Sequence, residues 1–427
     1  MEFPEKSRYK PETAQALLDL FRRSPELQEP PSWLKTLRYG ALTALEQEGL
    51  PTPLLERWKY TNLAPHIKGF GQKLDAAPLV YNGPDKFVKN LREILSDPPD
   101  WLASLLSERD EGAFRYRDMM LWDMGNLFLR DGLVVDIPVD NSVDKPVEIT
   151  VSGSDSGFYA PRLVIRLGRG SDLTVIERLT GEGRFWNNCV TQIQVGENAR
   201  LRHYRIQDSG DTSVFTGNTH VQVERDGTYE AFTLTAGAAL SRNQIHAELR
   251  GSNAVCNFYG INLLSGGQHG DTTAEIEHEA PHCRSNQFIR SVMSGRAHGV
   301  FQGKVHVHRA GQKTDAYQLS NALLLSEGAE MDTKPELEIY ADDVKCSHGA
   351  TTGRLEDEPL FYLRSRGLSE AEARSLLIGA FVGEVVDKLE DEVVKILVQK
   401  RIQTWLDKNP PSFLREGGHR GEGSHAP

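Results

Sequence analysis

The chain has 427 residues, of which 39% are hydrophobic and 26% charged; this excludes a wholly disordered protein and predicts two or three domains. Acidic residues outnumber basic ones by 60 to 49, so the formal net charge is −11. The basic residues are also dispersed along the chain. We therefore expect no nucleic-acid partner, because such partners are usually bound by a basic stripe.

No segment has the length and apolarity of a membrane span, so we expect no membrane association. The best apolar run, residues 376–382, is broken by Gly379 and falls well short of the roughly 20 residues that cross a bilayer. The first eight residues contain no apolar stretch and include acidic side chains, so neither a secretory signal nor a transit peptide is predicted. A cytoplasmic location follows as an expectation.

The cysteines are few and scattered. Cys189, Cys256, Cys283 and Cys346 form no C-x-x-C pair, which argues against a disulfide framework and against a structural zinc knuckle. Any metal site must therefore combine single residues that folding, or a partner, brings together.

The first hundred residues are predicted to be helical. Apolar residues at helical spacing predict helices over residues 11–23 and 31–48, the second ending before Gly49. A turn at residues 82–85 precedes a third predicted helix over 86–95, and a fourth is expected over 101–106.

From about Leu133 the hydrophobic period changes from that of helices to that of strands. Short alternating runs rich in Val, Ile, Thr and Tyr follow one another, separated by Gly, Asn, Asp and Ser. Every second run recurs after roughly 25–32 residues, a period typical of solenoids. The pattern predicts a mainly β protein with a β-helix core, with a large antiparallel sandwich or barrel as the alternative.

The pattern returns to helix after Thr352. Arg366 and Gly367 are typical of a helix end, and Ser369 with Glu372 is a capping box that opens the next helix. A further helix is predicted from about residue 384 to 406. The last 19 residues are rich in Pro, Gly, Ser and charge, and we expect them to be disordered.

The pentapeptide His278 to His282 matches the H-E-x-x-H zinc motif, which requires a helix. Pro281 would fall inside that helix, and residues 273–277 alternate as a strand. We therefore expect no metalloprotease site here.

His306 and His308 lie two residues apart, so a strand would place both imidazoles on one face, as a chelate for a first-row metal. Lys304 shares that face and opposes cation binding. His298 and Glu277 are candidate third ligands. A stand-alone metal-binding enzyme that uses His306 and His308 is the alternative function of the chain; a plain polar strand face is the simpler interpretation.

Cys346 and His348, at the end of the strand region, also lie two residues apart. An extended backbone would offer a thiolate and an imidazole on one side, a pair suited to iron or zinc or to a nucleophilic dyad. Two ligands cannot close a metal site, and a buried structural cysteine is the simpler interpretation. Motifs of nucleotide-binding P-loops, dinucleotide folds and α/β-hydrolases are missing from the sequence.

Several stretches resemble the SufD family of the SUF iron–sulfur cluster assembly system. The most specific is YADDVKCSHGATTG at residues 340–353, followed by LFYLRSRG at 360–367. The resemblance extends to KPELEI at 334–339 and AEIEH at 274–278, and LERWKYT at 55–61 is similar to the family's N-terminal signature. The absence of a cysteine-rich segment favours SufD over its generally longer paralogue SufB.

The resemblance implies a right-handed parallel β-helix between helical domains and a non-catalytic scaffold function. Such a subunit pairs with SufB through the β-helices and binds the ATPase SufC through its C-terminal helices, so that SufC hydrolyses ATP. Whether the isolated chain forms a homodimer stays open. We accordingly predict an N-terminal helical domain at 1–110, the β-helix core at 111–350, the SufC-binding helical domain at 351–408 and the disordered tail at 409–427.

The resemblance also assigns residues. The family's interfacial histidine, implicated with a SufB cysteine in holding transient iron or a nascent iron–sulfur cluster, corresponds to His348, and its neighbouring cysteine corresponds to Cys346. The expected SufC-binding residues are Phe361, Tyr362, Leu363, Arg364, Arg366 and Gly367. A reduced flavin has been associated with the SUF scaffold, but no flavin motif is visible in this sequence and no residues are assigned to it.

Overall fold

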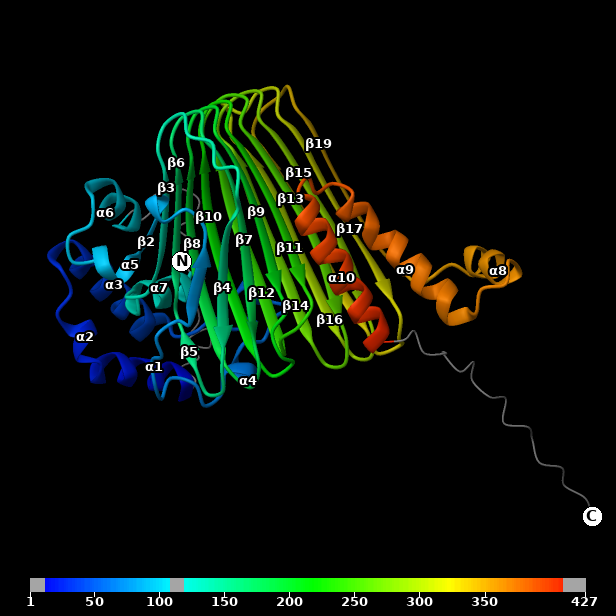
Figure 1. Cartoon of the computed structure of the whole chain (residues 1–427), viewed down its shortest axis with the longest axis horizontal. Coiled ribbons are helices and arrows are strands. Elements are labelled where there is room, and N and C mark those ends of the chain that lie inside the picture. Colours follow the sequence, from blue (N-terminus) through cyan, green and yellow to red (C-terminus); the bar gives the residue numbers. More distant parts are fainter. Residues whose placement is uncertain (1–11, 108–118, 410–427) are drawn as a thin grey trace, which may run out of the picture.

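The computed structural model describes residues 12–107 and 119–409, and its core is a β-solenoid of two facing sheets (Figure 1). The first sheet contains β1(Leu79–Asn82), β4(Val147–Gly153), β7(Asp172–Gly181), β9(Arg200–Gln207), β11(Thr228–Thr235), β13(Val255–Leu264), β15(Arg284–Met293), β17(Asp315–Leu324) and β19(Lys345–Gly353). The second contains β2(Val88–Asn90), β3(Gly132–Ile137), β6(Arg162–Leu167), β8(Trp186–Val195), β10(Val214–Val223), β12(Leu240–Leu249), β14(His269–His278), β16(His298–Val307) and β18(Glu330–Ile339), and β5(Phe158–Tyr159) pairs with β8.

From β6 onward the chain alternates between the two sheets, so each strand pairs with the strand two places further on. Except for β1 with β4 and β2 with β3, these pairs are parallel. Leu240 pairs with His269, and His269 pairs with His298, so these coils repeat every 29 residues. The predicted β-helix core with helices at both ends is confirmed, and the sandwich or barrel is excluded.

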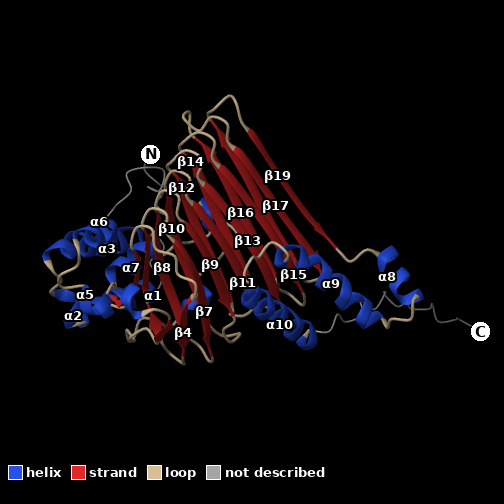
Figure 2. Cartoon of the chain, turned by 45° about the horizontal axis from the view of Figure 1, so that its top comes forward, coloured by secondary structure: helices blue, strands red, loops and turns tan. Residues whose placement is uncertain are grey.

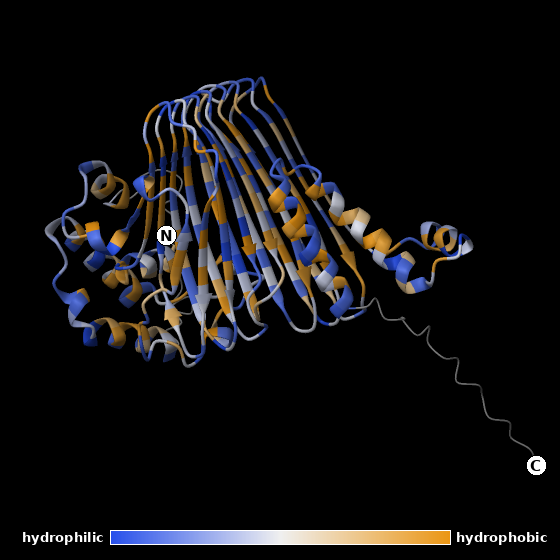
Figure 3. Cartoon of the chain, viewed as in Figure 1, coloured by the Kyte–Doolittle hydropathy of each residue, from blue (hydrophilic) through white to orange (hydrophobic). Residues whose placement is uncertain are grey.

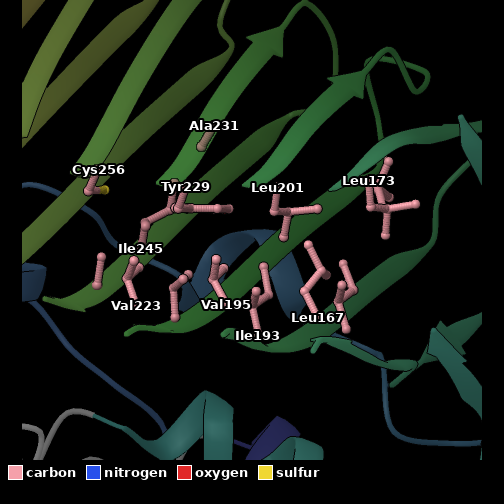
Figure 4. Close-up of a cluster of buried hydrophobic side chains, with 14 of the residues drawn as sticks. Leu167, Leu173, Ile193, Val195, Leu201, Val223, Tyr229, Ala231, Ile245 and Cys256 are labelled. Carbon is pink, nitrogen blue, oxygen red and sulfur yellow. The ribbon is translucent and has the colours of Figure 1, made fainter. Parts of the chain in front are cut away.

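Side chains from the inner faces of the two sheets meet in an apolar core (Figure 4). Leu201 and Tyr229 from the first sheet face Ile193 and Val223 from the second, and all four are at most 1% exposed. Because in-register pairing stacks equivalent positions, the core continues from coil to coil as columns of aliphatic residues.

One corner of the solenoid is built from residues in the left-handed backbone conformation. Successive coils place there Asp140, Gly170, Asn198, Asp226, Asn253, His282 and Lys313, with φ between 53° and 67°. Asn, Asp and Gly tolerate this conformation best, which explains the polar residues that separate the strands in the sequence. The corners are also joined, since the amide of Asn198 donates to Arg225 O at 3.0 Å and that of His282 donates to Gln312 O at 2.8 Å.

Helices cover the first coils of the solenoid (Figure 2). They are α1(Glu12–Arg23), α2(Pro25–Gln28), α3(Ser32–Glu48), α4(Ala64–Ile67), α5(Leu91–Ile94), α6(Asp100–Ser107) and α7(Met120–Leu127). Apolar residues of these helices, such as Leu17 and Met124, pack in one cluster with Phe158 and Trp186 of the solenoid. The helices predicted over 31–48 and 101–106 are confirmed, and so is the one over 11–23 from Glu12 onward, since residue 11 lies outside the described residues.

The helix predicted over residues 86–95 is wrong in its first half. Residues Asp85–Phe87 form a 3₁₀ helix and Val88–Asn90 form strand β2, so only α5 is α-helical. Val88 pairs antiparallel with Val135 of β3, and this pairing between distant segments outweighs the local helical spacing.

The segment of residues 55–61 crosses the outer face of the second sheet. Trp58, within the 3₁₀ helix Glu56–Trp58, is buried with the guanidinium of Arg242 4.0 Å above its ring. Arg242 forms a fully buried ion pair with Asp271, which also accepts a hydrogen bond from Thr61. The backbone oxygen of Arg57 accepts hydrogen bonds from Arg242 and from Gln302 Nε2. This segment therefore fastens β12, β14 and β16 from outside.

Three helices follow the solenoid, namely α8(Asp357–Ser365), α9(Glu370–Val386) and α10(Glu392–Lys408). Helices α9 and α10 pack on the outer face of the first sheet, where Ile378 and Val398 join a cluster with Ile261 and Val292. The predicted capping box at Ser369 is present. The last predicted helix began too early, because α9 extends to Val386 and Asp391 caps α10. Figure 3 shows that hydrophobic residues continue along α9 beyond the solenoid.

Helix α8 projects away from the solenoid (Figure 1). Apart from Asn409, the predicted tail at 409–427 lies outside the described residues. Among the described helices, none combines the length and the apolarity needed to cross a membrane.

We expect Asp271→Ala to lower the free energy of unfolding by about 3–5 kcal/mol, because it leaves the guanidinium of Arg242 buried without its counter-charge. Urea unfolding followed by circular dichroism measures the change. Glu197→Ala, which removes an exposed pair with Arg225 at 2.8 Å, is the matched control and should leave the unfolding midpoint nearly unchanged. Equal midpoints for the two variants would contradict the importance of this buried pair.

Candidate functional site

The solenoid ends in two strands that each have a free edge. Strand β19 pairs with β17 and strand β18 pairs with β16, and no described strand pairs with their other edges. Most residues of β19 are exposed, whereas every residue of β14, in the middle of the solenoid, is buried. This end therefore presents two rows of unpaired backbone donors and acceptors, a surface on which another sheet can continue the ladder.

Cys346 and His348 both lie on β19 and project to the same side of the strand, because side chains alternate. They continue the columns of Ala316 and Gln318, their register partners on β17. Cys346 is half-buried against an apolar cluster that includes Val307, whereas His348 is exposed. The structure thus brings the two predicted ligands to the open end of the solenoid, and their role as ligands stays a prediction.

The environment of Cys346 favours the protonated thiol. Burial raises the pKa of the Cys346 thiol, and the nearby carboxylate of Asp315 raises it further. A thiolate at this position therefore needs a positive charge from outside, such as a metal ion or a group on a partner.

Polar side chains line the interior just below His348. Gln318 is 3% exposed, and neither its Nε2 nor its Oε1 has a hydrogen-bond partner among the described residues. Ser320, on the same strand, is 1% exposed, and its Oγ also has no partner in the part of the chain that the structure describes. Buried polar groups are nearly always hydrogen-bonded to protein, water or a ligand. This end of the interior can therefore bind water or a polar ligand.

The other three cysteines do not offer metal ligands. Cys189, Cys256 and Cys283 are buried inside the solenoid. Burial raises the pKa of Cys189 and of Cys256 to about 12 and that of Cys283 to about 11. These thiols are protonated at neutral pH and serve as small core residues.

His306 and His308 are brought together with Glu277 on the outer face of the second sheet. Nε2 of His308 lies 2.8 Å from Glu277 Oε2, and Nδ1 of His306 lies 3.5 Å from the same oxygen. Glu277 pairs in register with His306, across one coil of the solenoid. Of the two predicted third ligands, Glu277 joins the cluster, whereas His298 is engaged with Asp332 at 2.8 Å.

The sequence alone did not indicate the other histidines and acids of this face. His246 approaches Glu277 Oε1 at 2.7 Å, and His220 approaches Glu248 at 3.3 Å. Each pair joins positions about 30 residues apart, so only the coil period and the exact register could have revealed them.

The rejection of a zinc motif at residues 278–282 is confirmed. His278 ends β14 and is buried, with Nε2 2.8 Å from Ser285 Oγ, and burial lowers its pKa to about 3. His282 occupies the left-handed corner position. The two imidazoles therefore lie on a strand end and in a turn, where they cannot form the helical chelate.

The predicted partner-binding residues lie on α8 and just after it. Phe361 and Tyr362 are 74% and 56% exposed, and Leu363 is half-buried. Arg364, Arg366 and Gly367 are exposed. Two aromatic side chains on a short projecting helix are costly to leave in water, which is typical of a surface that binds a partner.

A second apolar feature lies between α9 and α10. Leu376 is 53% exposed, and the space above Gly379 and Gly383 is open, so the two helices form a groove with a smooth floor. The groove lies between α9 and α10, and the exposed aromatic residues lie on α8, the helix that precedes α9 (Figure 1).

Comparison with known proteins places these features in a family. The sequence model "SUF system FeS cluster assembly, SufBD core domain" matches residues 149–381, which include the open end of the solenoid and the Glu277 cluster. An iron–sulfur cluster assembly SufBD family protein of Synechocystis is 34% identical over 302 residues, 67% of this chain and 65% of that protein.

Two further relatives give the same picture. The iron–sulfur cluster assembly protein SufD of Escherichia coli is 34% identical over 254 residues, 59% of this chain and 60% of SufD. The chloroplastic protein ABCI7 of Arabidopsis thaliana is 30% identical over 322 residues, 72% of this chain and 67% of that protein. The chain spans 65%, 60% and 67% of the length of these three relatives. It belongs to the SufBD family of the SUF iron–sulfur cluster assembly system, as a SufD-like member.

Proposed function

We propose that this chain is a non-catalytic scaffold subunit for iron–sulfur cluster assembly, which pairs with SufB, docks the ATPase SufC and contributes His348 and Cys346 as interfacial ligands. The observation that carries the proposal is the open end of the solenoid, where the two predicted ligands sit on a strand with an unpaired edge. The family membership supports it, since one relative is the iron–sulfur cluster assembly protein SufD of Escherichia coli.

The open end favours a partner that is itself a β-solenoid. The free edges of β18 and β19 belong to the two facing sheets of the solenoid. A rigid partner that is also built from two facing sheets with the same spacing can therefore pair with both edges. Pairing satisfies the exposed backbone groups and removes the edges on which chains otherwise aggregate. SufB, the paralogue implied by the resemblance, meets this requirement, and a second copy of this chain is the homodimeric alternative when SufB is absent.

The ligand set also points to a shared site. Cys346 and His348 supply two donors, one thiol and one imidazole, which together suit iron. A stable iron or cluster site needs further ligands, and these would come from the partner across the open end. Iron or the nascent cluster is the cargo of such a site, and its positive charge would deprotonate the Cys346 thiol.

SufC docking is assigned to the C-terminal helices. Phe361 and Tyr362 of helix α8 are exposed, and the helix itself projects away from the solenoid (Figure 1), so a bound subunit can reach both side chains. The rigid packing of α9 on β13 and β15 would transmit motion of that subunit to the core. ATP hydrolysis would then occur in SufC, and this chain would act as its mechanical anchor.

We expect His348→Ala to leave the complex intact but to deplete its metal. The chain, tagged and co-expressed with SufB and SufC, is purified and reconstituted anaerobically, and iron content and visible absorbance are measured. Loss of one ligand should weaken metal binding by at least about 10–100-fold, the cost usually seen when even an outer-shell group is removed. Ser347→Ala, on the same strand but facing the other way, is the matched control and should retain the cluster.

Two outcomes would contradict the proposal. Equal cluster content in the wild type and in the His348→Ala complex would make this chain a purely structural arm. Failure of SufB to co-purify with the folded wild-type chain would overturn the pairing itself.

Phe361→Asp should abolish SufC binding without unfolding the solenoid, because it places a charge at the centre of the exposed aromatic surface. Pull-down and calorimetry with purified SufC should show a loss of at least about 30-fold in affinity, the size of a binding hot spot. Val139→Asp, at a solvent-exposed apolar residue near the opposite end of the solenoid, is the control. Unchanged affinity in Phe361→Asp would exclude α8 as the docking surface.

A further inference from the structure

We propose that Glu277, His306 and His308 form a binding site for a divalent first-row metal ion, separate from the open end of the solenoid. The site lies on the outer face of the second sheet, because the neighbouring residues Ile276 and Val305 point into the core. It does not depend on the scaffold function proposed above, since all three ligands come from this chain alone.

The spacing of the donor atoms fits a metal. Zinc–ligand bonds of about 2.0–2.1 Å in a tetrahedral site place neighbouring ligand atoms about 3.3–3.4 Å apart. The separations from Glu277 Oε2 are 2.8 Å to His308 Nε2 and 3.5 Å to His306 Nδ1, which bracket this value. One donor atom from each of the three residues lies within 4.8 Å of the other two.

The cluster is also incomplete as a metal-free hydrogen-bond network. Both imidazoles aim at the same carboxylate oxygen, and their rings stack with centroids 4.3 Å apart. Among the described residues, none forms a hydrogen bond of acceptable geometry with the buried Nδ1 of His306. A neutral imidazole could donate one N–H to the carboxylate, but Nδ1 of His306 lies 3.5 Å from it, whereas one metal ion would take a lone pair from each neutral ring and from the carboxylate.

The surroundings support an ionised carboxylate in a fixed position. His246 lies 2.7 Å from Glu277 Oε1, the oxygen turned away from the site, as an outer-shell partner of a metal ligand does. His308 lies 2.8 Å from the other oxygen, so the carboxylate is held at both ends.

Lys304, which the sequence analysis counted against metal binding, is directed elsewhere. Its Nζ lies 2.7 Å from Glu338 and 3.3 Å from Glu275, so two carboxylates compensate its charge. The charge of Lys304 therefore does not prevent a cation from binding at Glu277, His306 and His308.

The three proposed ligands differ in their exposure to solvent. The side chains of Glu277, His306 and His308 are 2%, 13% and 38% exposed, so the rim at His308 reaches solvent. Two imidazoles and one carboxylate with an open position are the ligands of many zinc sites and of non-haem iron(II) sites. Zn²⁺ and Fe²⁺ are therefore the expected ions, and Mg²⁺, which prefers oxygen ligands, is not.

The neighbouring group of His220, His246 and Glu248 does not qualify in the same way. All three residues are buried, and the second carboxylate oxygen of Glu248 lies 2.6 Å from the guanidinium of Arg250. An arginine at the carboxylate already supplies the charge that a metal would bring.

The test uses the full chain, purified without partners and stripped with a chelator. Zn²⁺ is titrated by calorimetry, Fe²⁺ is titrated anaerobically, and Co²⁺ serves as a spectroscopic substitute whose visible bands report coordination by nitrogen and oxygen. We expect about one equivalent of Zn²⁺ to bind and to raise the melting temperature. His306→Ala and His308→Ala should each weaken binding by at least 10–100-fold, abolish the Co²⁺ bands and remove the thermal shift.

Two controls isolate the site. His298→Ala removes a partly exposed histidine of the same sheet, which contacts Asp332 and lies outside the cluster, and it should bind metal as the wild type does. The double variant Cys346→Ala, His348→Ala empties the open end and should also retain the ion. Circular dichroism of the unloaded variants verifies that each is folded.

The proposal is overturned if the wild type binds neither Zn²⁺ nor Fe²⁺, or if the His306 and His308 variants bind as tightly as the wild type. Loss of binding in the Cys346, His348 double variant alone would place the metal at the open end instead. Because cluster assembly is not a readout here, failure of this site and failure of the scaffold function are distinguishable.

Discussion

Parallel pairing in strict register between successive coils is the interaction on which the rest of this structure depends. It converts a sequence separation of about 29 residues into direct contact, so that Glu277 meets His306 and Gln318 lies beneath His348. The same register aligns the apolar columns of the core and the left-handed corner residues. A slip of one residue in any coil would turn core residues outward and disperse both candidate sites.

In such a solenoid each coil is stabilised mainly by its neighbours. The first and last coils each lack one neighbour, so their exposed apolar surface and unpaired strand edges must be covered in another way. At the first coils, helices such as α1 and α7 bury apolar surface against Phe158 and Trp186. At the last coil the chain instead leaves in α8, and β18 and β19 keep their free edges. The two ends therefore differ physically, since one is closed by this chain and the other is suited to closure by a partner. The position of Cys346 and His348 at the second end joins the assembly surface to the chemistry proposed for it.

Much of the fold was readable from the sequence, because the period of the strands and the helix signals at Gly49 and Ser369 are local. The alternation of a strand was likewise enough to place Cys346 and His348 on one face. Features that depend on pairing between residues distant in the sequence could not be predicted. Residues 88–90 have helical spacing, yet they form a strand because Val135 is available to pair with them. His246 could not be connected with Glu277 from spacing alone, since the two residues are 31 positions apart and meet only when the chain between them folds into one coil. The sequence likewise did not show that the charge of Lys304 is compensated. Glu275 and Glu338 approach it only because the strands pair in this register.

The segment around Trp58 has a consequence for how the protein is made. Its partners on the solenoid lie far along the chain, since 218 residues separate Arg57 from Glu275 and 245 separate it from Gln302. At a synthesis rate of about 5–20 residues per second, this segment leaves the ribosome roughly 10–50 seconds before the strands that bury it exist. During that interval the contacts of Arg57 with Glu275 and Gln302 cannot form, and the segment is fastened completely only when β14 and β16 exist. Complete fastening of this segment is therefore a late step in maturation, and a chain interrupted before β14 would lack both contacts.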